Sequence, residues 1–474
     1  SYVMGYDRCQ NQVDASKDEI NQMSEIVEKA INAGALGFST SRTILHRDIH
    51  GVYVPGTEAS SEEMKELAFA VDRAGEGTLE IVSDWLDQEI EMSWMKEYVE
   101  KSDCGLTVLQ TNGDSVKTIL YCEEQFLKGK NVRPQFPGRN VGMMFGLESS
   151  LHPFIGHPSY REIADLPLSE KVKIMKDPAF KEKLLNEKPN FASEIEKSMN
   201  DQGNTKSQEE IKEAANLGLK LISNYDTQFI LGDPPNYEPG KEDSIAALAK
   251  SKGIAELEVI YDEFLKNDGT NLVYACFTPY DNHKLDFVER AYSLKSSVAG
   301  GSDGGAHCGL ICDASMPTTN LSHWARDREA GKKIPIELIV RKQTKDTAET
   351  YGLFDRGEIK TGMLADLNII DFEKLNVTHP KMVYDLPLGG RRLIQTSSGY
   401  LATVKSGEVV YEAGEATGIL PGKLIRGKQT CEVKTEKERV PFIDRTLRLM
   451  SVKAFKLLWN FRKSSVKTTV VSDD

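Results

Sequence analysis

The pattern of apolar and polar positions switches repeatedly between a helical period and a strand-like period. Apolar residues recur at helical spacing, with charges between them, over 15–33, 61–74 and 88–101. Short apolar runs of strand length lie near 35–40, 79–84 and 106–110. Gly34 is expected to end the first helix, and Ser60 or Ser61 to cap the second. Alternating strands and helices predict an α/β architecture with parallel strands.

Two further changes of pattern divide the rest of the chain. Residues 157–266 are polar, helix-rich and full of lysine and glutamate, with a predicted loop at 200–207, which is typical of an inserted lid. Strand-like runs resume near 272–277 and 297–302, and short β runs separated by turns follow from residue 362. The predicted units are barrel strands and helices over 1–156, a helical insert over 157–266, more of the barrel over 267–361, a β-sandwich portion over 362–427 and a basic tail over 428–474.

The tail has the pattern of a basic amphipathic helix. Apolar residues fall near helical spacing at Ile443, Leu447, Met450, Ala454, Leu458 and Phe461, and basic residues lie between and after them at Arg445, Arg448, Lys453, Lys456, Arg462, Lys463 and Lys467. Such a helix can dock on its own protein or on a partner, or lie on an anionic membrane. Docking on protein is the favoured interpretation, with membrane contact as the alternative.

Composition narrows the class of protein. A chain of 474 residues with 39% hydrophobic content can form a large core with more than one unit, and a net charge of −13 argues against a nucleic-acid binder. Seven cysteines without regular spacing indicate a reduced, cytoplasmic compartment. Cys308 and Cys312 lie four residues apart, but no second pair matches them, so buried thiols are favoured over a metal site. The opening residues 2–4 read like the end of a strand, and we expect the barrel to begin upstream of Ser1.

The stretch 298–307 contains the strongest candidate for a catalytic residue. An apolar strand runs into Gly-Ser-Asp-Gly-Gly, whose glycines let the backbone turn sharply after Asp303. Asp303 is therefore expected at the C-terminal end of a barrel strand, where barrel active sites are built. A carboxylate there can take a proton from water and return it to a leaving amine. On spacing alone, an aspartate that caps the next turn is an equal alternative.

The order of several motifs resembles that of the amidohydrolase superfamily, and within it the N-acyl-D-amino-acid deacylases. The matching segments are 33–40, 53–57, 157–159, 302–307, 347–353 and 361–367. The resemblance implies a (β/α)₈ barrel with zinc or another divalent metal at the strand ends, a late lid, and a β-sandwich. It also implies hydrolysis of amides by metal-activated water, with Asp303 moving the proton.

The ligand positions of the family are not matched. Where the family has histidines at the ends of two strands, this chain has Ser83 and Gln110, and where it often has a lysine two residues later, this chain has Asn112. Serine and glutamine are poor zinc ligands, so we expect this chain to hold metal weakly and not to turn over amides alone. The family's substrate-binding arginine after the last-strand motif is not evident, which leaves the amide substrate open.

Loops after barrel strands form substrate pockets, so Arg42, His46, Tyr53, His307 and Asn112 are the expected substrate contacts. A metal pair of His46 and His50 is the less favoured alternative to a polar loop. The sequence therefore predicts a hydrolase of C–N bonds other than peptide bonds that acts on a small-molecule amide. The alternative is a non-catalytic protein of amidohydrolase-like fold that binds a small molecule or a partner.

Overall fold

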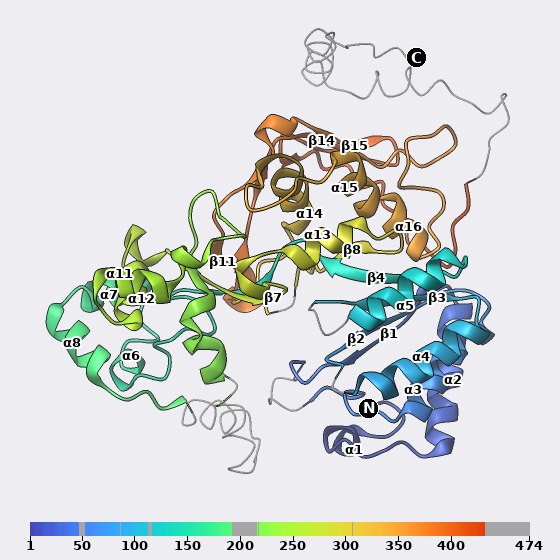
Figure 1. The fold of residues 1–474 in the computed structure, drawn as a ribbon, viewed down its shortest axis with the longest axis horizontal. Coiled ribbons are helices and arrows are strands. Elements are labelled where there is room, and N and C mark those ends of the chain that lie inside the picture. The colour runs from blue at the N-terminus through green and yellow to red at the C-terminus, as the bar shows by residue number, and fades with distance from the viewer. Residues whose placement is uncertain are drawn as a thin grey trace, which may run out of the picture.

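A five-stranded parallel sheet forms the centre of the molecule (Figure 1). The computed structural model describes residues 1–46, 53–85, 87–111, 116–191, 216, 218–305 and 307–431. The strand order is β1-β2-β3-β4-β8, and every pairing is parallel. The strands are β1 (Gly37–Arg42), β2 (Thr78–Ser83), β3 (Gly105–Leu109), β4 (Val132–Pro137) and β8 (Val298–Gly300). The α/β class is confirmed, and four of these strands coincide with predicted runs.

Helices from the first third of the chain cover one face of this sheet. They are α2 (Lys17–Asn32), α3 (Ser61–Arg73), α4 (Gln88–Lys101) and α5 (Val116–Leu127), preceded by the short α1 (Tyr6–Gln10). Alternate strand residues such as Leu79, Ile81, Leu106 and Val108 pack with helix residues in one hydrophobic core. Ser60 caps α3 by accepting a hydrogen bond from the Glu63 amide at 3.2 Å, as its sequence predicts.

Strand β4 was not predicted, although it is central in the sheet. Pro134 and Pro137 lie within it, and proline normally argues against a central strand because it cannot donate to the ladder. The ladder to β8 begins opposite Gln135, one residue after Pro134, so Pro134 has no partner residue in β8; Pro137 ends the strand opposite Gly300. The missed strand matters because the residues after it lie close to the candidate site.

The insert forms a separate lobe with its own core (Figure 1). Its helices are α6 (Pro158–Arg161), α7 (Leu168–Met175), α8 (Pro178–Asn186), α11 (Ile245–Lys252) and α12 (Glu256–Phe264), with 3₁₀ turns η2 (Tyr225–Thr227), η3 (Lys241–Asp243) and η4 (Asn267–Gly269). Strands β5 (Val141–Phe145), β6 (Gln228–Ile230) and β7 (Val273–Thr278) pair antiparallel in the order β5-β7-β6. The prediction of a barrel strand at 272–277 is therefore wrong: an apolar run shows that a strand forms, but not which sheet it joins.

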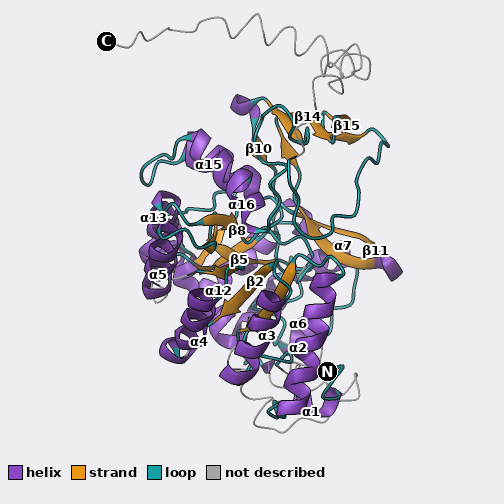
Figure 2. Ribbon diagram, turned by 90° about the vertical axis from the view of Figure 1, so that its right-hand side faces the viewer, coloured by secondary structure: helices purple, strands orange, loops and turns teal. Residues whose placement is uncertain are grey.

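The chain then returns to the parallel sheet and continues into a β-rich portion (Figure 2). The helical elements are η5 (Asp281–His283), α13 (Asp286–Ser293), α14 (Met316–Thr319), the π-helical η6 (Asn320–Asp327), α15 (Ile336–Gln343) and α16 (Lys345–Thr350). The β-rich portion contains β9 (Leu367–Ile370), β10 (Asn376–Val377), β11 (Lys381–Leu386), β12 (Gly390–Ile394), β13 (Ser397–Ser398), β14 (Tyr400–Lys405), β15 (Glu408–Glu412) and β16 (Glu415–Ala416), with η7 (Phe372–Lys374) and η8 (Pro387–Gly389). These strands form a four-stranded antiparallel sheet and two hairpin-like pairs, which agrees with the predicted β-domain.

A buried ion cluster joins the loop after β6 to η6. Glu238 is 2% exposed in its side chain and accepts hydrogen bonds from His323 at 2.7 Å and from Arg328, which is fully buried, at 3.0 Å. Burial alone would raise the pKa of Glu238, but the hydrogen bonds from His323 and Arg328 outweigh it and lower this pKa to about 2. The charged form of Glu238 is therefore the form that the folded protein stabilises.

Acid should remove the contribution of Glu238 to stability. Because its pKa is about 2 in the folded protein and 4.5 when unperturbed, the stabilisation is complete above pH 4.5 and is lost as the pH falls toward 2. We expect Glu238→Gln to lower the free energy of unfolding by about 3 kcal/mol at pH 7 and to converge with wild type near pH 2. Urea unfolding of both proteins at several pH values measures this. A difference that does not change with pH would contradict it.

Two predicted segments lie outside the described residues. These are the loop at 200–207 and nearly all of the basic tail, from residue 432 onward. None of the helices described has the length and apolar character that a bilayer-spanning segment requires. All seven cysteines are free thiols, in agreement with the absence of a disulfide pattern. The proposed domain boundaries remain predictions.

Candidate active site

The C-terminal edge of the parallel sheet carries the predicted site positions. Ser83 ends β2 and pairs with Arg42 at the end of β1. Gln110 follows β3, and its backbone N–H donates a hydrogen bond to the backbone carbonyl of Gln135 in β4 at 2.9 Å. Asp303 lies three residues beyond the end of β8, which pairs in parallel with β4. Since all these strands run the same way, their last residues lie at one edge.

Close packing explains the glycines before Asp303. A Cβ atom at Gly300 would lie 2.7 Å from the Gln135 Oε1 atom, and Gly301 has φ +75°, a conformation that L side chains rarely adopt. The backbone conformation at position 301 therefore favours glycine, and a larger side chain at position 300 would have to displace the Gln135 side chain. Asp303 itself is exposed, so its carboxylate can meet a ligand from solvent.

Electrostatics place His46 near Asp303. Partial loss of hydration and the neighbouring His307 lower the pKa of His46, whereas the charges of Asp84 and Asp303 act in the opposite direction. Such mutual effects require proximity, so residues from the loops after β1, β2 and β8 meet at this edge. His46 also lies close to strand β1, with Nδ1 2.6 Å from the Ser41 Oγ atom. Asp303, His46 and His307 therefore all belong to loops that leave the C-terminal edge of the parallel sheet.

The loop after β1 is held by a carboxylate that the sequence did not single out. Asp84 accepts hydrogen bonds from the Thr43 hydroxyl at 2.6 Å and from the Ile44 amide at 2.8 Å. The His46 carbonyl in turn accepts from the Val54 amide at 3.3 Å, which links the segment around Tyr53 to the same loop. Asp84 therefore orients the backbone that carries His46.

Arg42 has contacts that differ from its expected role. Its Nε atom lies 2.7 Å from a Glu91 carboxylate oxygen, both side chains being about one-tenth exposed, and its Nη1 atom donates to the Ala59 carbonyl at 2.8 Å. These contacts hold the loop before α3 against β1. Substrate contact by Arg42 or Tyr53 remains a prediction, and Asn112 lies outside the described residues.

A buried pair lies behind the Asp303 turn. Arg139, just after β4, is fully buried; its Nη2 atom lies 3.2 Å from Asp313 and donates to the Cys312 carbonyl at 2.8 Å. Burial, and to a lesser degree the charge of Asp303, raises the pKa of Asp313 to about 6, although Arg139 opposes this. The guanidinium of Arg139 also stacks on the Tyr237 ring, 3.7 Å from its centroid. The pair anchors the far end of the turn that presents Asp303.

The donor set at the strand ends does not fit zinc. Gln110 is 1% exposed, and neither of its side-chain amide atoms has a hydrogen-bond partner among the described residues. The Ser83 Oγ atom accepts a hydrogen bond from the Trp85 amide at 3.1 Å. Among the residues that the structure describes, no three His, Cys, Asp or Glu side chains are grouped closely enough to hold a metal ion. An amide and a hydroxyl are weak ligands beside imidazole or thiolate.

Installing the missing imidazoles should create a metal site. Ser83 and Gln110 end neighbouring strands about 4.8 Å apart, so two histidines there can share one ion. We expect Ser83→His with Gln110→His to tighten zinc binding at least about 100-fold, because each ligand contributes several kcal/mol. Competition with a chromogenic chelator measures this, with the two single variants as controls. A double variant that binds no better than the singles would show that these side chains do not converge.

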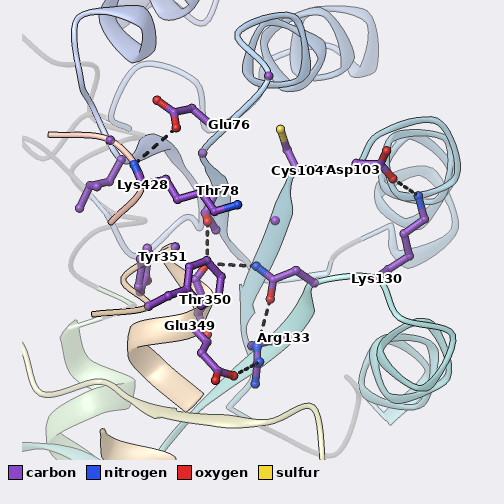
Figure 3. Close-up of a pocket in the computed structure, with 18 of the residues that line it drawn as sticks. Glu76, Thr78, Asp103, Cys104, Lys130, Arg133, Glu349, Thr350, Tyr351 and Lys428 are labelled. Atoms are coloured by element: carbon purple, nitrogen blue, oxygen red, sulfur yellow. Dashed lines mark hydrogen bonds and ion pairs between the residues drawn. The ribbon is translucent and has the colours of Figure 1, made fainter. Parts of the chain in front are cut away.

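The opposite edge of the sheet holds a cavity of about 540 Å³ (Figure 3). It is lined by residues at the N-terminal ends of strands and by the segment 349–352. The Thr350 carbonyl accepts hydrogen bonds from Thr78 at 2.8 Å and Asn131 at 3.2 Å, and Glu349 lies 3.3 Å from Arg133. The motif at 347–353 therefore closes the bottom of the sheet.

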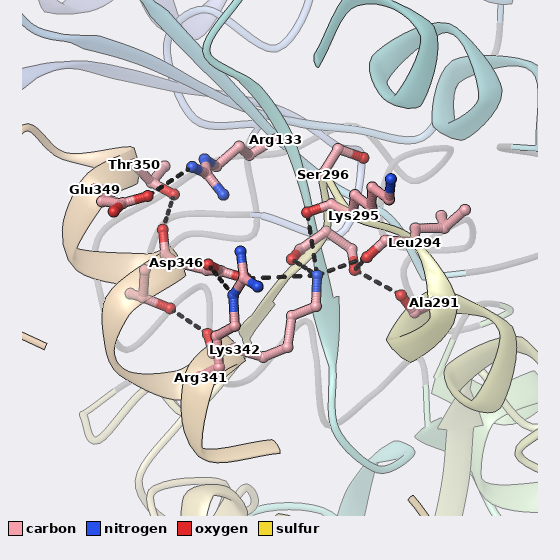
Figure 4. A network of polar contacts seen from close by, with 12 residues as sticks. Arg133, Ala291, Leu294, Lys295, Ser296, Arg341, Lys342, Asp346, Glu349 and Thr350 are labelled. Atoms are coloured by element: carbon pink, nitrogen blue, oxygen red, sulfur yellow. Dashed lines mark hydrogen bonds and ion pairs between the residues drawn. The ribbon is translucent and has the colours of Figure 1, made fainter. Parts of the chain in front are cut away.

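A polar network continues from this cavity toward β8 (Figure 4). Lys342 is 1% exposed and donates to the carbonyls of Leu294 at 2.6 Å and Ser297 at 2.7 Å. Burial lowers the pKa of Lys342 to about 8. Its contacts are backbone carbonyls and the Asp346 carboxylate at 3.7 Å, which are structural partners. The network fastens α15 and α16 to the start of β8.

Comparisons with known proteins identify one matching family and two similar solved structures. The sequence profile of the family described as "Amidohydrolase family" matches residues 7–411. Two solved structures of D-aminoacylases are similar to the chain: a mutant in complex with CuCl₂, at 17% identity and a TM-score of 0.47, and a second crystal structure at 18% and 0.45. Each covers 88% of this chain, which spans 67% of theirs. No curated protein matches the chain.

Proposed function

Because this chain belongs to the amidohydrolase family, we propose that it serves in the hydrolysis of C–N bonds other than peptide bonds in small-molecule amides, to which it contributes the sheet edge that carries Asp303. The observation that carries the proposal is the position of Asp303, exposed in the turn after β8 at the C-terminal edge of the parallel sheet. The motif order of the N-acyl-D-amino-acid deacylases favours an N-acyl amino acid as substrate. A cytoplasmic location belongs to the same hypothesis.

Asp303 would serve as the proton-transfer group. Its carboxylate accepts a proton from the water that attacks the amide carbonyl, so that a C–O bond forms while Asp303 becomes protonated. The same proton is then delivered to the amide nitrogen as the C–N bond breaks, which yields a carboxylic acid and an amine. His46 and His307 lie at the same edge and would contact the substrate.

The family resemblance implies zinc or another divalent ion, which would polarise the carbonyl when bound. The described side chains at this edge do not supply the ligands that such an ion needs, as the chemistry of Ser83 and Gln110 indicates. The proposal therefore assigns to this chain only substrate contact and proton transfer by Asp303.

A second candidate is binding of a small molecule without catalysis. It is favoured by Gln110, whose buried amide donor and acceptor have no partner in the described residues and would pair with a ligand's polar group. Hydrolysis releases a free amine, whereas binding alone does not. Incubation with a panel of N-acyl D- and L-amino acids, with and without added zinc, tests them by detection of free amine. Amine release supports hydrolysis, whereas thermal stabilisation by a panel member without amine release supports binding alone.

A further inference from the structure

Helix α5 exposes large apolar side chains along one side. Val116, Leu120 and Leu127 are 48%, 59% and 61% exposed, and their spacing places them within about 40° of one another around the helix. We call these three residues the α5 stripe. The buried residues Ile119 and Cys122 of the same helix face the core, so the α5 stripe is additional to the packing that holds the helix.

We propose that residues 440–463 of the same chain form an amphipathic helix that packs on the α5 stripe. This segment lies outside the described residues, and its sequence repeats apolar residues at spacings of three and four from Ile443 to Phe461. That period matches a helix with one apolar face, which requires an apolar partner surface in water.

The end of the described chain brings this segment close to α5. Lys428 lines the same cavity as Phe126 and Gly129, which lie at the C-terminal end of α5 (Figure 3). Residues 432–439 can span at most about 27 Å when extended, and α5 is about 18 Å long. The segment can therefore begin beside Leu127 and run along the stripe toward Val116.

The charge of the segment 440–463 also favours its binding to the α5 stripe. The segment 440–463 contains six arginines and lysines and a single acidic residue, in a chain whose net charge is −13. Glu124 lies on α5 beside the stripe with a side chain 61% exposed, and it pairs across one turn with Lys128. A basic side chain of the segment would meet this carboxylate while the apolar face of the segment covers Leu120 and Leu127.

Hydrogen exchange of the full chain tests the proposal. We compare wild type, Leu120→Asp with Leu127→Asp, and a control, Ile359→Asp, whose side chain is 89% exposed in the loop before β9. We expect amides of 443–461 to exchange at least about tenfold more slowly than an unstructured peptide in wild type and in the control. In the α5 double variant this protection should disappear.

Each other result would overturn the proposal. Unprotected amides in wild type would show that the segment does not dock, and protection that survives the α5 double variant would place it elsewhere. Protection that grows with protein concentration would indicate docking onto a second copy. Protection that appears only with vesicles of phosphatidylserine and phosphatidylcholine would assign the segment to a membrane surface.

Discussion

Replacing Asp303 with asparagine is expected to lower amide hydrolysis by about two to four orders of magnitude. Asparagine keeps the size of the side chain but cannot accept a proton from water or return it to the leaving amine. Because Asp303 is exposed and follows two glycines that set the turn, the fold should be retained. The measurement is the initial rate of amine release, with circular dichroism as the test of folding.

The matched control for Asp303→Asn is Asp385→Asn. Asp385 is about half exposed and forms a surface pair with Arg392 across the antiparallel strands β11 and β12. The Asp385→Asn substitution should leave the rate of amine release unchanged, because exposed ion pairs contribute little even to stability. A folded Asp303→Asn variant with the wild-type rate would remove Asp303 from the mechanism and leave membership of the family unaffected.

Replacing Arg328 with methionine should lower the free energy of unfolding by about 3–5 kcal/mol. Arg328 is fully buried and bonds to Glu238 through Nε and Nη2, both at 3.0 Å, and also pairs with Glu289. Its loss leaves the buried carboxylate of Glu238 short of a compensating charge. Urea unfolding followed by tryptophan fluorescence measures the change, and Trp324 reports on the site because the Arg328 guanidinium stacks on it at 4.3 Å.

Two further variants isolate the cause of that loss. Arg392→Met removes an arginine from an exposed pair and should cost about 1 kcal/mol or less. Glu238→Gln combined with Arg328→Met removes both charges, so it should be less destabilised than the sum of the two single variants. Additive effects would show that the charges do not act as a pair.

The sequence predicted the strands whose apolar runs are uninterrupted, and with them the edge where Asp303 lies. It did not predict β4, because Pro134 and Pro137 interrupt the pattern; Pro134 lies before the ladder to β8 begins, and Pro137 is the last residue of the strand. Because β4 was not predicted, Arg139 was not recognised as a residue near the candidate site. Its position becomes significant only when it is known to follow an interior strand of the parallel sheet. No local pattern distinguishes a strand of the parallel sheet from β7, since pairing partners are set by contacts distant in sequence.

In the candidate site, too, some features have a local sequence signal and others do not. The glycines around Asp303 carry a local signal because the turn requires them, so the position of this carboxylate could be predicted. The coupling of His46 to His307 joins residues about 260 positions apart and has no local signal. The role of Asp84 in holding the loop after β1 is likewise visible only in three dimensions.

Isotope incorporation tests the central claim, hydrolysis of an amide C–N bond at the edge that carries Asp303, most directly. The reaction is run in water enriched in ¹⁸O with an N-acyl amino acid that releases amine, and the acid product is analysed by mass spectrometry. The account predicts one ¹⁸O atom in the new carboxylate, one equivalent of amine, and formation of both products slowed at least about 100-fold by Asp303→Asn. Tight binding of the panel compounds with no ¹⁸O in any acid, with or without added divalent metal, would contradict it.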